Sequence, residues 1–435
     1  PLTIERLAFE RTGYPFTPAG AFRCSDARIN NLLPMLWRSL QACAHETYMD
    51  CPFYEQLMYV GDTRLECLTT YVWTRDFRLP RKALHLFDVS RTVGTPWLDC
   101  YVPTDAPHLI PSFCLWWIGM VHDYAHWRDD PATVCALLPG VRATLDLFLL
   151  RRDADGFITT PPGSWAYLDV ALGGPHPWIA GTVPDDGTGI NAILNLIAVH
   201  ALERAAELES VFGERALAVR NRRAARDLLR AICTRFLDPR SGVINATSQG
   251  YPSEHAQSLA VLSDALPACR RATIARALLE RDDLACTNIF FTHYLFEAYR
   301  RLGRPDRIMA RLADWFALPA RGLRTTPESF EPQTRSDCHA WGAHPLYHCM
   351  ASLLGIRPDA PGFRHVMIAP QFGDLTELEG VLPHPAGGDI RVRLERRGTT
   401  VRGDINLPRG LTGIFRYGAA ALALKPGTTR IAANV

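Results

Sequence analysis

Three carboxylates occur close together in one aromatic-rich stretch of the sequence. They are Asp50, Glu55 and Asp62, in YMDCPFYEQLMYVGDTR, residues 48–64. Pro52 and Gly61 disfavour one continuous helix here, so a loop can turn the carboxylates toward a common point. Converging carboxylates suit acid–base chemistry on a sugar or metal binding. An equally good local role for Asp62 is to cap the helix that follows, because Asp is a preferred N-cap.

A second segment rich in acids and histidines could supply the partner groups. RTTPESFEPQTRSDCHAWGAHP, residues 324–345, carries Glu328, Glu331, Asp337, His339, Trp341 and His344. The structural alternative makes Thr326 an N-cap and Pro327 the first helical residue, with Glu328 favoured by the helix dipole. The residues alone rank this alternative equal to a catalytic role for Glu328.

Two pairs of histidines have a spacing of four residues, His122 with His126 and His344 with His348. We do not expect a metal site at either pair, since no HExxH motif is present and no third ligand stands at a telling spacing. His122 and His126 are expected on a partly buried helix face.

The sequence is also rich in tryptophan, with ten residues. Flat aromatic rings pack on sugar C–H faces, although core packing explains at least half of such residues. Trp165 in GSWAYLD, residues 163–169, is the best candidate for a sugar platform, because glycines and polar residues surround it. Trp117 is a second candidate.

Helical periodicity extends from about residue 27 to residue 354. Apolar side chains recur at steps of three and four, as in Phe113, Trp117, Met120, Tyr124 and Trp127. Such steps place side chains on one helix face. About a dozen segments of this kind, joined by short Pro, Gly and Asp loops, predict helical hairpins. No fixed-length repeat is visible, which disfavours a solenoid.

The period changes to two after Gly355. Ile390, Val392 and Leu394 alternate with charged residues, which predicts half-buried strands. We therefore predict a mainly α protein, an (α/α)6 barrel of six hairpins followed by a small antiparallel β-sandwich. The expected limits are a lead-in segment at 1–26, a barrel at 27–356 and a sandwich at 357–435.

Composition narrows the functional classes. The 435 residues have a formal net charge of +2, so no broad basic field favours nucleic acid. The longest apolar run, FCLWWIGMV, is too short to span a bilayer. Twelve cysteines without a CxxC pair lean weakly toward a reducing, cytoplasmic compartment. The sequence begins at Pro1, where we expect a cut edge, so export is not excluded.

Together these patterns resemble the inverting α-L-rhamnosidases, which have an (α/α)6 barrel followed by a β-sandwich. The resemblance rests on the acid loop DCPFYEQLMYVGD and on TTPE, which ends at Glu328 and is followed by CHAWGAHPLYHCMASLLGI. It extends from about residue 30 to the end of the chain. Tyr54 and Gln56 stand where the family usually has arginine. Tyr59 stands in place of a tryptophan, and Pro327 stands where the family usually has a tryptophan just before the catalytic base.

The resemblance implies an inverting glycosidase with Glu55 as general acid and Glu328 as general base. We expect Phe53, Leu57 and Tyr59 to raise the pKa of Glu55 by hydrophobic cover. The substrate would be an oligosaccharide or a rhamnosylated glycoside, and neither a metal nor an organic cofactor is needed. The residues expected to bind the sugar are Asp50, Asp62, Tyr54, Tyr59, Arg64, Trp117, Trp165, His339 and Trp341.

Other functions stay open at this point. The altered Tyr54 and Gln56 suggest the same fold acting on another deoxy sugar or a uronic acid, as a glycosidase or a lyase. A catalytically inactive glycan-binding protein is a third possibility. The presence of all four acidic residues expected in the site, Asp50, Glu55, Asp62 and Glu328, argues against it. A barrel acting on isoprenoid diphosphates is a distant fourth, because the sequence has no DDxxD cluster.

Overall fold

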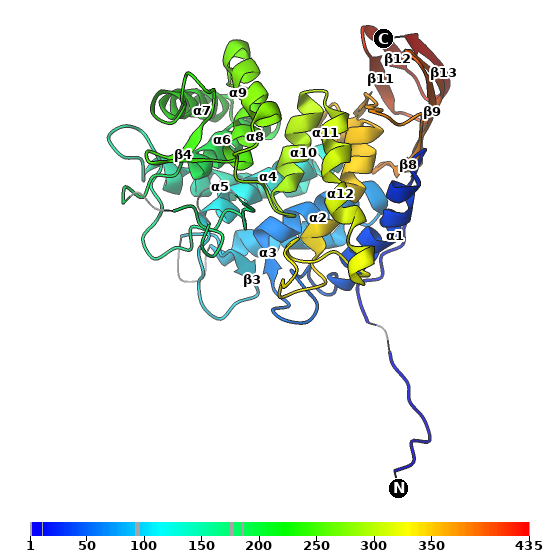
Figure 1. The fold of residues 1–435 in the computed structure, drawn as a ribbon, viewed down its shortest axis with the longest axis horizontal. Coiled ribbons are helices and arrows are strands. Elements are labelled where there is room, and N and C mark those ends of the chain that lie inside the picture. Colours follow the sequence, from blue (N-terminus) through cyan, green and yellow to red (C-terminus); the bar gives the residue numbers. More distant parts are fainter. Residues whose placement is uncertain (1, 11, 92–95, 174–177, 185–186, 435) are drawn as a thin grey trace.

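Helices make up most of the body of this protein (Figure 1). The computed structural model describes residues 2–10, 12–91, 96–173, 178–184 and 187–434. Within them, the inner ring is formed by α2, Val60–Trp73; α4, Pro111–Trp127; α6, Ala192–Phe212; α8, Glu254–Leu262; α10, Thr292–Arg301; and α13, Pro345–His348. Each inner helix contacts the next. The short π-helix Cys349–Leu353 that continues α13 contacts α10, and α13 contacts α2, so the ring closes.

Each of the first five inner helices is followed by an outer helix. The outer helices are α3, Arg78–Ser90; α5, Pro131–Leu149; α7, Arg215–Arg235; α9, Ala268–Glu280; and α11, Pro305–Arg311. The ring closes differently at the sixth position, where α1, Ala27–Ala42, comes from the start of the chain and packs on α13 and on α12, Ala313–Phe316. This arrangement confirms the predicted barrel of helical hairpins.

Burial distinguishes the two layers. Every residue of α2 is buried, and α4 is buried on nearly all sides. The outer helices α3 and α7 instead bury one stripe of residues and expose the rest to solvent. The outer helices α3 and α7 are therefore amphipathic, whereas the inner helices α2 and α4 touch protein on nearly all sides.

One outer helix, α5, is long and apolar enough to cross a bilayer by length and composition. It packs on α4 and α6 in the barrel wall, and its Arg142 pairs with the buried Glu209 of α6. Buried core helices can have the same length and apolar composition as a membrane-spanning helix.

The C-terminal module consists of two sheets. Its strands are β6, Ile356–Pro358; β7, His365–Ile368; β8, Glu377–Pro383; β9, Asp389–Arg397; β10, Thr400–Leu407; β11, Thr412–Tyr417; β12, Ala420–Leu424; and β13, Gly427–Asn434. One sheet has the order β1-β8-β9-β10-β13 and the other β12-β11-β7-β6. Ile390, Val392 and Leu394 are buried, as the alternation predicts. The pairing of β11 with β7 is parallel, whereas every other strand pair of the two sheets is antiparallel among the described residues.

The first strand of the module comes from the other end of the chain. β1, Ala21–Cys24, pairs antiparallel with β8, so that Ala21 lies opposite Val381. The segment before it, residues 2–10, extends away from the body of the protein (Figure 1). The predicted domain limits stay a prediction.

Candidate active site

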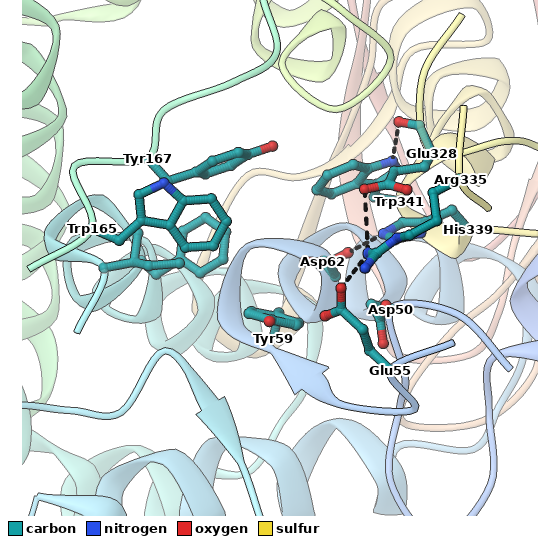
Figure 2. Close-up of a pocket in the computed structure, with 12 residues that line it drawn as sticks. Asp50, Glu55, Tyr59, Asp62, Trp165, Tyr167, Glu328, Arg335, His339 and Trp341 are labelled. Carbon is teal, nitrogen blue, oxygen red and sulfur yellow. Dashed lines mark hydrogen bonds and ion pairs between the residues drawn. The ribbon is translucent and has the colours of Figure 1, made fainter. Parts of the chain in front are cut away.

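One pocket gathers most of the residues that the sequence singled out (Figure 2). Its empty space, counted together with its open side, is about 410 Å³. Its lining consists of Asp50, Glu55, Tyr59, Asp62, Ile110, Phe113, Trp165, Tyr167, Glu328, Arg335, His339 and Trp341. Several of these lie at the start of inner helices α2 and α4 or just before α13, so the pocket lies at one end of the barrel.

The acid loop is folded back on itself by its first carboxylate. The Asp50 N–H donates to the carbonyl of Leu57 at 2.8 Å, and the Leu57 N–H donates to Asp50 Oδ1 at 2.9 Å. Between them Gln56 takes a left-handed conformation, with φ of 57°. The loop thereby presents Glu55 to the pocket. Phe53 is 78% exposed and does not provide the expected hydrophobic cover.

Asp62 lies within helix α2 and does not cap it. The N-cap is Tyr59, and Asp62 is in the first turn, so the capping alternative is wrong. Its carboxyl group is buried and hydrogen-bonded to His339 Nε2, with a distance of 3.0 Å to Oδ1. Gly61 leaves room for Phe113, whose ring lies 2.6 Å from where a Cβ would stand.

Burial raises the pKa of Asp62, and the nearby carboxylates of Glu55 and Glu328 raise it further. Burial also raises the pKa of Asp50, whose Oδ2 is buried with no hydrogen-bond partner among the described residues. The pKa of His339 is lowered by burial. Ionising these groups at the pocket floor therefore costs free energy, because they are buried away from water.

We expect the Asp62→Asn variant to be more stable than the wild type at pH 8 and equally stable near pH 4. Because the folded-state pKa of Asp62 is raised, the unfolded chain loses this proton at a lower pH than the fold does, from about pH 3.9 upward. Wild-type stability is therefore lost as pH rises, and asparagine removes that loss. Urea melts at both pH values, with Asp105→Asn as an exposed control, measure the effect. Parallel pH profiles of wild type and Asp62→Asn would contradict it.

Glu328 reaches the pocket from an irregular segment. No helix begins at Thr326 or Pro327, so the predicted helix start is wrong. Instead, the Thr326 N–H donates to Ser39 Oγ at 2.8 Å, and Thr326 Oγ1 donates to the carbonyl of His339 at 2.9 Å. Trp341 Nε1 donates to the backbone carbonyl of Glu328 at 3.0 Å. These bonds fix the base candidate without a helix.

Arg335 lies between the two glutamates (Figure 2). Its Nη2 forms a hydrogen-bonded ion pair with Glu55 Oε1 and lies 3.7 Å from Glu328 Oε1. The two carboxylate oxygens on either side of this nitrogen are thus less than about 6.2 Å apart, slightly closer than the roughly 6.5–9.5 Å at which inverting glycosidases hold their carboxyl groups. The side chain of Arg335 is 48% exposed.

Aromatic rings form the opposite wall. Figure 2 shows Trp165 and Tyr167 across the pocket from Trp341. The Trp165 ring lies 5.0 Å from that of Tyr167, and Trp165 Nε1 donates to the carbonyl of Ala180 at 3.0 Å. Because Trp165 is still 37% exposed, its ring can contact a ligand.

Replacing Gly181 with alanine should lower kcat/KM for the substrate roughly 10- to 100-fold, because small displacements in a site are costly. A Cβ at Gly181 would lie 2.3 Å from the Tyr167 ring and push it into the pocket. Gly163 is a matched control, since it also has positive φ but no atom within 4 Å of a Cβ. Equal kinetics of Gly181→Ala and Gly163→Ala would contradict the prediction.

Three residues expected to bind the sugar do not line the pocket. Trp117 is fully buried on the side of α4 that faces α3, where its Nε1 donates to the Leu84 carbonyl, so its prediction is wrong. Arg64 is buried in the core and paired with Asp123. Tyr54 lies outside the lining, 54% exposed, with the Arg335 guanidinium 5.7 Å from its ring centre.

One group in the pocket could hold a metal ion by the proximity of its ligand atoms, namely Asp50, Cys51 and His339. Asp50 Oδ1 accepts from Leu57, and His339 Nε2 is bonded to Asp62. The other side-chain atoms, Asp50 Oδ2 and His339 Nδ1, have no hydrogen-bond partner among the described residues. We assign no cofactor to this pocket.

Two family models match the chain in sequence order. The bacterial alpha-L-rhamnosidase 6 hairpin glycosidase domain matches residues 17–353, and the bacterial alpha-L-rhamnosidase C-terminal domain matches residues 355–415. The chain belongs to the bacterial α-L-rhamnosidase family. A search of curated proteins gave no match.

Solved structures of rhamnosidases share the fold. A GH78 family rhamnosidase of Bacillus sp. GL1 is 28% identical, with a TM-score of 0.83 over 93% of this chain and 43% of its own. A Klebsiella oxytoca rhamnosidase with rhamnose bound is 23% identical, with a TM-score of 0.66 over 76% and 65%. A Streptomyces avermitilis α-L-rhamnosidase complexed with L-rhamnose is 17% identical, with a TM-score of 0.77 over 97% and 42%. This chain thus spans less than half the length of the Bacillus protein.

Sequence reasoning missed four lining residues, Ile110, Phe113, Tyr167 and Arg335, although the last two lie in segments that it singled out. Tyr167 is two residues from Trp165, and Arg335 is seven residues from Glu328. An arginine is a weak indicator of a functional site in this chain, because arginine is common in it. Of its 47 Lys and Arg residues, only Lys82 and Lys425 are lysine. No sequence feature distinguishes Arg335 from the others.

Proposed function

We propose that this protein is an inverting α-L-rhamnosidase, which releases terminal L-rhamnose from an oligosaccharide or a glycoside. The observation that carries the proposal is the pair Glu55 and Glu328, brought from two distant segments to one aromatic-walled pocket of a six-hairpin glycosidase barrel. Rhamnose-bound relatives support the choice of sugar.

In the proposed mechanism Glu55 protonates the departing glycosidic oxygen. Glu328 removes a proton from the water that attacks the anomeric carbon from the other face. Because Glu55 must carry a proton and face the leaving oxygen, Arg335 has to leave its contact with Glu55 when substrate enters. Movement of this half-exposed side chain requires no change in the fold.

The remaining pocket residues would bind and orient the sugar. Asp50, Asp62 and His339 present polar atoms at the pocket floor, where they can form hydrogen bonds with hydroxyl groups of the sugar. Trp165, Tyr59 and Trp341 supply ring faces and edges for the apolar side of the sugar ring.

Arg335 favours a second candidate, a sugar that carries a carboxylate. A guanidinium beside the reaction centre binds carboxylates with paired hydrogen bonds. A uronic acid glycosidase or lyase would use it directly, and a lyase would leave an unsaturated product that absorbs ultraviolet light.

The deciding experiment follows hydrolysis of aryl α-L-rhamnosides by proton NMR, with aryl uronides and other aryl deoxyglycosides as competitors. We expect turnover of the rhamnoside and first appearance of the β anomer of L-rhamnose. First appearance of the α anomer would overturn the inverting mechanism. Turnover of uronides alone would overturn the sugar, and stoichiometric binding of rhamnose without turnover of any glycoside would indicate a binding protein.

A further inference from the structure

Two histidines and a glutamate meet at the end of the barrel away from the pocket. His122 and His126 lie on α4, four residues apart and on one face, and their ring centres are 4.4 Å apart. Glu207 comes from the neighbouring inner helix α6. The pocket residue Phe113 is nine residues before His122 on α4, which corresponds to about 14 Å along the helix. This cluster takes no part in the chemistry proposed above.

The three side chains point their ligand atoms at one place. Glu207 Oε2 is 2.7 Å from His122 Nε2 and 4.0 Å from His126 Nε2, and one ligand atom of each residue lies within 4.8 Å of the others. Zinc bonds of about 2.0–2.1 Å in a tetrahedron separate neighbouring ligand atoms by roughly 3.3 Å. Shifts of less than 1 Å would therefore suffice to enclose a metal ion.

Charged groups lie behind two of these ligands. The His122 Nδ1 faces Asp123 Oδ1 at 4.0 Å, and Glu207 Oε1 is 3.1 Å from Arg204 Nη2. A carboxylate behind the far nitrogen of a histidine, and a partner for the free oxygen of a carboxylate, are the usual supports of metal ligands. His126 has no hydrogen bond among the described residues, which leaves its nitrogen available.

The cluster is reachable from solvent. Side-chain exposure rises from 11% at His122 to 25% at His126 and 38% at Glu207. Three protein ligands with one side open leave a fourth position for water.

We propose that His122, His126 and Glu207 form a binding site for a divalent transition-metal ion of the zinc type. Imidazole and carboxylate ligands suit Zn²⁺, Ni²⁺, Co²⁺ and Cu²⁺ over Mg²⁺ and Ca²⁺, which prefer all-oxygen sites. The ion would join α4 to α6 in the inner ring and stabilise the barrel from the end opposite the pocket. The proposal does not depend on the function proposed above.

A second histidine group is the closest alternative. His293, His344 and His348 also bring ligand atoms together, but all three are buried. His293 Nδ1 and His348 Nε2 are hydrogen-bonded to each other at 3.0 Å, and His344 Nε2 donates to the carbonyl of Ile289 at 2.9 Å. These bonds explain the group as a packed polar network, and nothing opens it to solvent.

The test measures Zn²⁺ binding to tag-free, chelator-treated protein by calorimetry and by competition with a chromophoric chelator. We expect one Zn²⁺ per chain, a rise in Tm on addition of Zn²⁺, and with Co²⁺ the visible absorption of a tetrahedral site. His126→Ala should weaken binding at least tenfold, because it removes a ligand and keeps the contact between His122 and Glu207. Glu207→Gln should also weaken it.

His85→Ala is the matched control, since His85 is an exposed histidine on the outer helix α3. It should bind Zn²⁺ as the wild type does. Circular dichroism and rhamnoside turnover confirm that each variant is folded. The proposal is overturned if the wild type binds no stoichiometric Zn²⁺, or if His126→Ala and Glu207→Gln bind it unchanged, which would place the ion elsewhere.

Discussion

The Glu55→Gln variant should turn over a rhamnoside with a sugar leaving group about 10²- to 10⁴-fold more slowly than the wild type. This is the usual contribution of a positioned general acid. Glutamine has nearly the same shape and can still accept the contact from Arg335, so the loss reports on the missing proton. We expect KM to change little, and steady-state kinetics measure both constants.

Leaving-group dependence separates the acid from the base. A nitrophenolate departs without protonation, so Glu55→Gln should lose much less activity on a nitrophenyl rhamnoside. Glu328→Gln lacks the group that activates water and should be slow on both substrates by a similar factor. Glu46→Gln and Glu331→Gln, at exposed glutamates near the two residues in sequence, should behave as wild type. The reverse pattern would exchange the two roles.

The Arg64→Met variant should lose about 3–5 kcal/mol of unfolding free energy, the usual result of removing one partner of a buried ion pair. Arg64 Nε lies 2.9 Å from Asp123 Oδ2, and Arg64 Nη1 donates to Tyr294 at 3.3 Å. Burial alone would raise the pKa of Asp123, but the Arg64 guanidinium outweighs it and holds that pKa well below its usual range. Without Arg64 a charged carboxylate would stay buried. Urea unfolding measures the loss.

A second substitution tests the cause. Arg64→Met combined with Asp123→Leu should recover part of the lost stability, because no unpaired charge remains. Gly119 leaves the space that the guanidinium fills, since a Cβ there would lie 2.8 Å from Arg64 Cζ. An Arg64→Met protein of wild-type stability but much higher KM would contradict the structural role and make Arg64 a sugar ligand.

The barrel and the β module could be predicted from periodicity, because the two periods of 3.6 and 2.0 reflect local geometry. The orientation of the inner helices could not. Helix α4 is buried on nearly all sides, so its apolar pattern does not distinguish the face toward the barrel axis from the face toward the outer helices. Trp117 was for this reason expected in the pocket, although its ring packs against α3.

The candidate site could likewise be predicted only in part. Asp50, Glu55 and Asp62 are close in sequence, and Pro52 and Gly61 already indicate an irregular loop. Glu328 is 273 residues from Glu55 in the sequence, so only the tertiary fold brings the two together. Its segment does not start a helix and is fixed instead by the hydrogen bonds from Thr326 to Ser39 and His339. The third ligand of the proposed metal site, Glu207, could not be predicted from the sequence either, because it is 85 residues from His122.

The pairing of β1 with β8 has a consequence for the order in which the chain can acquire its structure during synthesis. Ala21 is synthesised 360 residues before its partner Val381. Helices of the barrel can form as they emerge from the ribosome, whereas this edge of the sheet cannot form until the whole barrel has been made. Contacts of such long sequence separation slow folding. We therefore expect the edge of β1 that faces β8 to stay unpaired while the barrel helices are synthesised.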